Sequence, residues 1–183
     1  MLACLADPSQ RRIIAAIGQN RHDLQRRGGS MEAIYEIVER PAQRITGRLW
    51  EGTFVEAADG AIHRLIAETQ EHRRRTHPRD HAALIGLSWN VRSEGFSYLV
   101  GYVGEDRATF AEPDHMDLPA MRFVTTMHHP EGGDVFVQYQ RMFDWIAAEG
   151  HIVDTSCLHY REEYEAGFVS PSASSLRLMI PIR

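Results

Sequence analysis

The sequence carries two copies of a strand–helix–strand–strand pattern, and this repeat constrains the fold more than any other feature. Residues 41–45, Pro-Ala-Gln-Arg-Ile, correspond to residues 119–123, Pro-Ala-Met-Arg-Phe, 78 positions later. Helices predicted to begin at Asp59 and Asp134 are 75 positions apart, and such drift is expected where loops differ in length. In this alignment Trp89 corresponds to Tyr160. We therefore predict a duplicated unit with pseudo-twofold symmetry.

The periodicity of apolar residues places the elements of the two copies. Strands are expected at 34–39 and 43–50, which are interrupted by a proline, and then at 84–91, 96–103, 121–127, 155–164 and 176–182. Amphipathic helices are expected at 59–75 and 134–149, and the polar stretch 104–118 is expected to be a loop. The sequence predicts an α+β fold: an antiparallel sheet with helices on one face and a ligand cleft on the other.

Residues 155–164, Thr-Ser-Cys-Leu-His-Tyr-Arg-Glu-Glu-Tyr, predict the binding site. Alternate side chains of a strand point to opposite faces, so Tyr160, Glu162 and Tyr164 share one face. A carboxylate between aromatic rings suits a cation, because the ring faces add quadrupole attraction and apolar area. Without a ligand, we expect Glu162 to be partly protonated or to accept hydrogen bonds from tyrosine hydroxyl groups. The rest of the predicted ligand-binding set is Trp89, Tyr98, Tyr102 and Phe123.

The alternative is an exposed edge strand on which Glu162 faces water. A shift of one residue in strand register would produce that arrangement, because it exchanges the two faces.

Length and composition set the class of protein. The 183 residues suit one domain with a short appendage. We expect an N-terminal helix and linker at residues 1–30, followed by a binding domain at residues 31–183. The net charge of −5 argues against a general nucleic-acid surface. We expect no signal peptide, no membrane span and a cytoplasmic location.

The sequence does not favour two further kinds of site. His115, His128, His129, Glu131 and Asp134 are close in sequence, but they lack the spacing of metal ligands, and we expect solvated loop histidines and neither a metal nor a cofactor. Cys157 has the opposite strand parity to Glu162, and we expect an inert thiol on the helix side of the sheet.

The chain resembles the gyrase-inhibitor-like family, the effector-binding domains of bacterial multidrug-sensing transcription activators. The resemblance covers residues 33–183 and depends on the order of several short segments. These are residues 38–47, 119–123, 139–146, 162–164 and 178–182. The family implies a duplicated fold whose cleft binds bulky, often cationic, aromatic compounds. Its Glu-x-Tyr pattern maps to Glu162 and Tyr164, and the glutamate is implied to meet the cation.

The chain departs from the family in two places. Residues 128–133, His-His-Pro-Glu-Gly-Gly, stand where the family has a His-Gly-Pro-like turn, so ligand access there is expected to differ. The 30 residues that precede the domain are fewer than a usual DNA-binding domain needs, so no direct nucleic-acid contact is expected.

The resemblance leaves open whether the bound compound is sensed, sequestered or destroyed. Some relatives are understood to hydrolyse reactive small molecules, and here Glu162 and Tyr164 would act as acid and base. Other relatives act on protein partners, as in the inhibition of gyrase. The main prediction is a small-molecule binder, and hydrolysis and a protein partner remain its alternatives.

Overall fold

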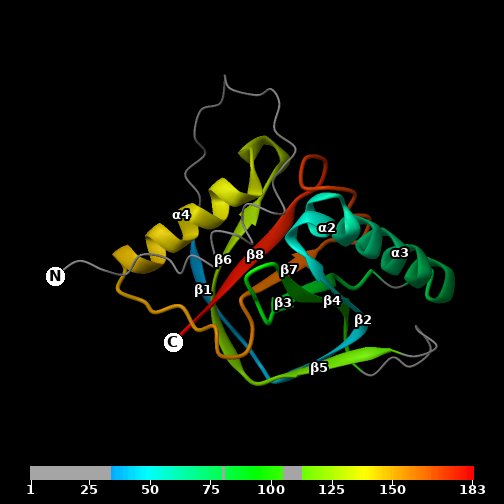
Figure 1. Cartoon of the computed structure of the whole chain (residues 1–183), viewed down its shortest axis with the longest axis horizontal. Helices are drawn as coiled ribbons and strands as arrows, with labels where there is room; N and C mark the ends of the chain where they lie inside the picture. Colours follow the sequence, from blue (N-terminus) through cyan, green and yellow to red (C-terminus); the bar gives the residue numbers. More distant parts are fainter. Residues whose placement is uncertain (1–33, 80, 105–112) are drawn as a thin grey trace.

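The computed structural model describes residues 34–79, 81–104 and 113–183, which form one eight-stranded antiparallel sheet and three α-helices (Figure 1). The predicted N-terminal helix and linker at residues 1–30 lie outside the described residues. The first copy contains β2 (Gln43–Thr53), α2 (Phe54–Ala58), α3 (Ala61–Thr76), β3 (Leu84–Trp89) and β4 (Gly95–Val103). The second contains β6 (Met121–His128), a 3-10 turn η1 (Pro130–Gly132), α4 (Val135–Ala148), β7 (Tyr160–Tyr164) and β8 (Leu176–Ile182). β1 (Glu36–Arg40) precedes the first copy, and β5 (Asp114–Leu118) precedes the second.

The strand order confirms the predicted α+β fold and its duplicated unit. The sheet runs β1-β6-β8-β7-β3-β4-β2-β5, so each strand of one copy has its counterpart at the mirrored position. The pseudo-twofold axis therefore passes between β3 and β7. The strand registers extend the Pro41–Pro119 correspondence from β2 and β6 to β3 and β7. In this alignment of the two copies, Gly86 of β3 is the counterpart of Glu162 of β7, and the two residues also pair directly with each other. In the same alignment, the equivalent of Tyr160 in the first copy is Leu84, so the predicted correspondence of Trp89 with Tyr160 was wrong.

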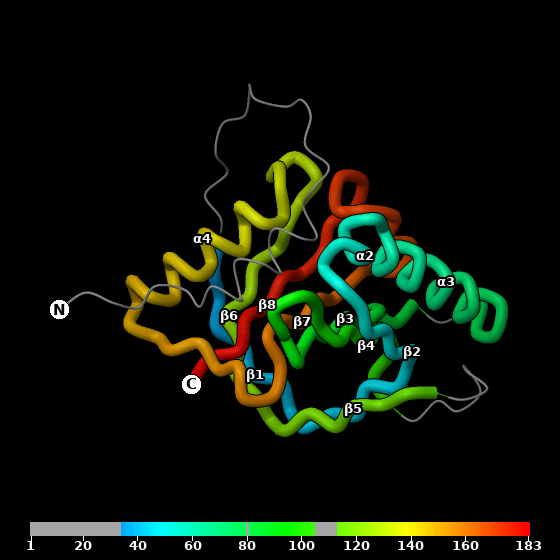
Figure 2. Tube along the Cα trace, in the orientation of Figure 1, coloured from blue at the N-terminus to red at the C-terminus, as the bar shows by residue number. Residues whose placement is uncertain are grey.

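The two prolines bend a pair of strands that closes the sheet. Gln43 pairs with Leu118, and Arg40 pairs with Met121, so one antiparallel register continues across both bends. The connections β1–β2 and β5–β6 thus lie side by side, at the lower edge of Figure 2. Because β1 joins β6 while β5 joins β2, this bent ribbon links the two ends of the sheet, and the sheet curls around one of its faces.

The two sheet faces carry separate cores. All three helices pack on the outer face, with α4 over the β6–β8 half and α2 and α3 over the other half (Figure 1). Their shared core includes Leu65, Met142, Ile146, Val100 and Leu178. The inner face, enclosed by the curl, has its own core of Ile45, Ile85, Leu87, Leu99, Leu118, Phe123, Leu158 and Met179.

Three boundaries differ from the prediction. Thr53 begins α2 with a capping box, in which its hydroxyl group accepts from the Glu56 N–H and the Glu56 carboxylate accepts from the Thr53 N–H. Asp59, predicted to begin one long helix, instead ends α2, and Gly60 precedes α3. The predicted loop 104–118 contains β5, and the predicted strand 155–164 is regular only over Tyr160–Tyr164.

Within the described ranges, no helix has the length and apolar character needed to cross a membrane.

Candidate functional site

The strand β7 separates its side chains as predicted, but the face that carries Glu162 is the one under the helices. Tyr160 and Tyr164 belong to the outer core with α3 and α4, and Tyr139 of α4 contacts Glu162 directly. The sequence predicts Glu162 on the face away from the helices, and this prediction is wrong. Strand parity shows which side chains share a face, but only the packing of an amphipathic helix decides which face is covered.

Three tyrosine hydroxyl groups donate hydrogen bonds to the Glu162 carboxylate. Oε1 accepts from the Tyr139 hydroxyl group at 3.0 Å. Oε2 accepts from the Tyr98 hydroxyl group at 2.9 Å and also from that of Tyr164. The Tyr98 and Tyr164 oxygens are themselves 2.8 Å apart. The expectation that Glu162 takes hydrogen bonds from tyrosines therefore agrees with this geometry.

These hydroxyl groups reach one carboxylate from three elements: β4, α4 and β7. Tyr98 must cross β3 to do so, because β3 lies between β4 and β7. It crosses at Gly86, where an added Cβ atom would lie only 2.0 Å from the Tyr98 hydroxyl oxygen. The absence of a side chain at Gly86 therefore opens the path by which Tyr98 reaches Glu162.

Aromatic rings surround the carboxylate. The Tyr160 ring packs at 4.7 Å from the Tyr139 ring and 6.2 Å from that of Phe143. The Tyr164 ring packs at 4.6 Å from Phe168. The Tyr160 hydroxyl group is buried and has no hydrogen-bond partner among the described residues. We call Tyr98, Tyr139, Tyr160, Glu162 and Tyr164 the Glu162 cluster.

Burial and the carboxylate act together on the tyrosines of the Glu162 cluster. Burial is the largest cause that raises the pKa of Tyr98, Tyr139 and Tyr164 well above the usual value, and the negative charge of Glu162 raises each of them further. The same two causes raise the pKa of Tyr160. The four hydroxyl groups therefore remain protonated near neutral pH and stay available as hydrogen-bond donors.

The Glu162 side chain is partly exposed, whereas the four tyrosines around it are buried. A negative charge is thus held at the edge of an apolar core by oriented hydroxyl groups. This arrangement can attract a cation to the exposed side of the carboxylate.

The structure brings only some of the predicted ligand-binding residues together. Tyr98, Tyr160 and Tyr164 lie in the Glu162 cluster. Trp89 and Phe123 instead pack with the inner core, on the opposite sheet face from Glu162. For Trp89 the cause is the register, in which its neighbour Ser88 faces Tyr160. Tyr102 shares the outer face, but the Arg73 guanidinium already lies 4.7 Å from the centre of its ring.

The residues weighed for other chemistry are dispersed. His128 ends β6 and is buried, contrary to the expected solvated loop, and its burial lowers the pKa of its imidazole. Asp134 accepts from the Phe136 N–H as the N-cap of α4. Across the described ranges, no three His, Cys, Asp or Glu residues gather as metal ligands would. Cys157 packs against the inner core, not on the helix side as predicted, and burial raises its thiol pKa.

Sequence reasoning missed three residues that shape the site: Tyr139, Gly86 and Phe168. Tyr139 looked like one more apolar residue of the α4 stripe, although a buried tyrosine usually has a partner for its hydroxyl group. Gly86 lies inside a strand, where a glycine often marks the close approach of another group. Phe168 lies in a loop, where no periodic pattern indicates its neighbours.

Comparison with known proteins agrees with this fold. A protein called SAV2435, solved with bound tetraphenylphosphonium, superposes with a TM-score of 0.60 at 14% identity, covering 82% of this chain and 94% of that one. A putative bacterial transcription regulation protein from Staphylococcus aureus Mu50 has a TM-score of 0.57 at 16% identity, covering 82% and 98% of the two chains. The EcmrR C-terminal domain has a TM-score of 0.57 at 13% identity, covering 84% and 99%.

No curated protein matches the sequence. The model of one protein family does: its description is a GyrI-like small molecule binding domain, and it covers residues 34–183. That range includes every described strand and helix. The chain therefore belongs to the family of GyrI-like small molecule binding domains.

Proposed function

We propose that residues 31–183 bind bulky aromatic cations against Glu162 and serve to sense or sequester such compounds. The observation that carries the proposal is the convergence of three tyrosine hydroxyl groups on one partly exposed carboxylate. A carboxylate removed from water is costly by several kcal/mol unless it is compensated. Hydroxyl groups compensate it in part, and a lipophilic cation compensates its charge while burying apolar area at about 25 cal/mol per Å².

The fold neighbour solved with tetraphenylphosphonium supports this choice of ligand class. Tetraphenylphosphonium is a cation that has only aromatic rings on its surface. The Glu162 cluster offers the two complementary features, a negative charge and ring faces. Ring faces do not demand one ligand shape, so we expect several unrelated aromatic cations to bind.

In this proposal the domain works in the cytoplasm and does not itself contact DNA. The net charge of −5 supports the second point, because a negative protein is repelled by the phosphate backbone. Adding duplex DNA is expected to leave the affinity for the cation unchanged.

Calorimetric titration with tetraphenylphosphonium tests the proposal. Wild type is expected to bind. The affinity of Glu162→Gln is expected to be at least about tenfold lower, a loss of about 1.4 kcal/mol or more in binding free energy. Glu165→Gln is the matched control, since Glu165 follows β7 but is exposed. Tetraphenylborate, which has the same shape and a negative charge, is expected not to bind.

Equal affinity in wild type and Glu162→Gln would overturn the proposal. Mass spectrometry of the recovered ligand separates binding from hydrolysis: an unchanged mass agrees with a binder, and an altered mass with an enzyme.

A further inference from the structure

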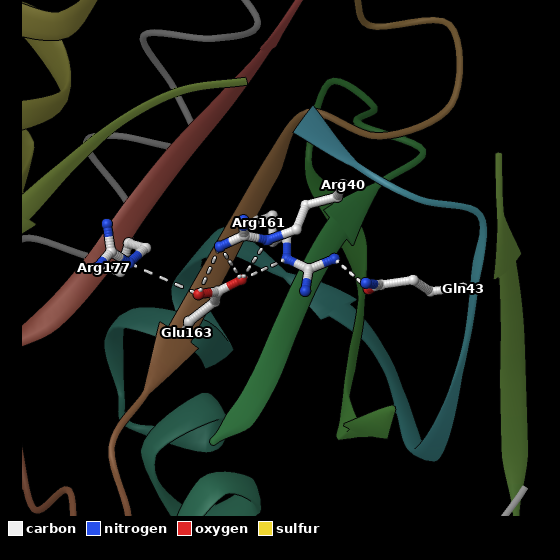
Figure 3. Close-up of polar contacts among 5 residues, drawn as sticks. All are labelled: Arg40, Gln43, Arg161, Glu163 and Arg177. Atoms are coloured by element: carbon white, nitrogen blue, oxygen red, sulfur yellow. Dashed lines mark hydrogen bonds and ion pairs between the residues drawn. The ribbon is translucent and has the colours of Figure 1, made fainter. Parts of the chain in front are cut away.

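A second cluster of polar side chains lies on the inner face of β7, on the opposite side of the strand from the Glu162 cluster. It consists of Arg40, Gln43, Arg161, Glu163 and Arg177, which we call the arginine cluster (Figure 3). The Glu163 carboxylate accepts from Arg40 at 3.2 Å and from Arg161 at 3.1 Å, and it lies 3.6 Å from Nε of Arg177. Three guanidinium groups thus share one carboxylate.

The arginine cluster spans the inside of the curled sheet. Arg161 and Glu163 belong to β7, whose neighbours in the sheet are β8 and β3. Arg40 and Gln43 come from β1 and β2, at the bend that joins these strands. Arg161 also donates to the side-chain oxygen of Gln43 at 3.0 Å. The cluster therefore joins β7 and β8 to the bend of β1–β2, and its geometry is fixed by the closure of the sheet.

The charges of the arginine cluster do not balance. Glu163 offsets one of its three guanidinium groups, and Gln43 is neutral, so two positive charges remain in excess. Arg161 is only 2% exposed. Burial is the main cause that lowers the pKa of Arg161; the charge of Glu163 opposes this effect, and that of Arg40 adds to it. Arg161 is bound directly to Glu163 and Gln43, so the excess positive charge belongs to Arg40 and Arg177, which share the same carboxylate. An anion that approached these two groups would offset it.

Two of the arginines can be reached from solvent. The side chains of Arg40 and Arg177 are 28% and 33% exposed, and that of Glu163 is 15% exposed. The Arg177 guanidinium group lies in the ion pair with Glu163 and, among the described residues, donates no side-chain hydrogen bond. Its guanidinium donors are therefore available to an incoming anion, close to those of Arg40.

We propose that the arginine cluster binds a phosphate group of a small molecule. A phosphate carries up to two negative charges near neutral pH, which matches the excess of two positive charges. Guanidinium groups fit phosphate oxygens with paired N–H donors. This site is on the other sheet face from the Glu162 cluster and does not depend on the proposed cation binding.

Titration with inorganic phosphate at constant ionic strength tests the site. Phosphate is expected to bind saturably to the full-length protein in calorimetry and to raise its melting temperature beyond the effect of chloride. Arg177→Gln is expected to weaken phosphate binding about tenfold or more. Arg48→Gln is the matched control, because Arg48 is similarly exposed and makes one ion pair, with Glu68; it is expected to bind like wild type.

The proposal is overturned if phosphate and chloride act alike on wild type, or if Arg177→Gln binds phosphate as tightly as wild type does. The comparison of the two salts needs no variant, so it holds even if a substitution unfolds the protein. Glu162→Gln is expected to keep its affinity for phosphate, which separates this site from the proposed cation site.

The source of the phosphate is tested with two further probes. Phenyl phosphate, a small phosphomonoester, is expected to bind at least as well as inorganic phosphate. A short DNA duplex is expected to bind more weakly than either, because the whole chain is negative. Binding that occurs only with the duplex would contradict a small-molecule site.

Discussion

At the scale of single residues, the Glu162 carboxylate has little capacity for another hydrogen bond. Its two oxygens offer about four acceptor positions, and three tyrosine hydroxyl groups take most of them. A ligand that brings its own N–H donors must compete with these hydroxyl groups. A cation without N–H donors can lie beside the carboxylate and leave the hydrogen bonds in place.

We therefore expect discrimination between cations of similar size. Benzyltrimethylammonium should bind about tenfold more tightly than benzylammonium, a difference of about 1.4 kcal/mol. Calorimetry with both ligands on wild type measures it. The opposite order would mean that the ligand displaces a tyrosine hydroxyl group from Glu162.

The tyrosines also make the stability of the folded state depend on pH in the alkaline range. All six tyrosines have a pKa raised above the usual value of about 10, chiefly through burial, and the shift is largest for the Glu162 cluster. The folded state therefore keeps these protons at a pH at which the unfolded chain has lost them. Stability should be fully present below about pH 10 and should fall as the pH rises above it.

Two measurements check the alkaline prediction. The free energy of unfolding in urea should be lower at about pH 11 than at about pH 9, because unfolding then releases tyrosine protons. The absorbance of tyrosinate should increase mainly when the protein unfolds. Ionisation of every tyrosine near pH 10 in the folded protein would show that the hydroxyl groups are open to water.

At the scale of elements, β3 and β7 show how a duplicated unit becomes an asymmetric site. The registers make Gly86 the counterpart of Glu162, at the point where the pseudo-twofold axis passes between the two strands. One copy supplies a carboxylate at this point. The other supplies a gap, through which Tyr98 passes. A second carboxylate at position 86 would lie beside the first, and like charges at such a distance disfavour each other.

Gly86→Ala should therefore damage the site. The added Cβ would lie 2.0 Å from the Tyr98 hydroxyl oxygen and 3.1 Å from Cε2 of Tyr164. Both tyrosines are buried and have little room to move. We expect a loss of about 1–3 kcal/mol in stability and at least tenfold weaker binding of tetraphenylphosphonium. Gly132→Ala is the control, since the nearest atom to its Cβ would be 3.7 Å away; a similar loss there would remove the explanation.

The start of α4 affects the site through Tyr139, which lies one turn further along the helix. The Asp134 side chain accepts from the Phe136 N–H at 2.8 Å. Asp134→Ala removes this cap and should lower the stability by about 1 kcal/mol, whereas Asp134→Asn keeps an acceptor and should be nearly neutral. Urea unfolding of the two variants measures the difference. Equal loss in both would indicate that the charge of Asp134, and not its cap, stabilises the helix.

Local patterns predicted most of these elements, because each strand and helix of the two copies has a periodic apolar face. They failed where structure depends on distant partners. β5 is polar and exposed at three of its five positions, so only its pairing with β2 makes it a strand. The repeat offered a hint, since β1 precedes Pro41 as β5 precedes Pro119. Parity grouped Tyr160, Glu162 and Tyr164 correctly, yet it carried no information on which face α4 covers or that Tyr139 completes the site.

At the scale of the whole molecule, the closure of the sheet connects the two faces of β7. Glu162 points outward to the tyrosines, and the adjacent Glu163 points inward to Arg40 of β1. β1 also pairs with β6 along its length, and the backbone oxygen of Ile34 accepts from the Thr126 hydroxyl group. The position of Glu162 thus depends on β1 through the neighbouring residue Glu163.

Two shortened chains test this dependence. A chain that begins at residue 31 retains β1 and all the contacts described around Glu162, and it should bind tetraphenylphosphonium within about twofold of the full chain, a difference under about 0.5 kcal/mol. A chain that begins at residue 41 lacks β1 and the Arg40–Glu163 ion pair. It should lose at least about 2 kcal/mol of stability, because each lost hydrogen bond contributes about 1 kcal/mol. Urea unfolding and calorimetry on both chains measure these effects. If the shorter chain were as stable and bound as tightly, β1 would be dispensable, and the strands β2 to β8 alone would hold Glu162 in place.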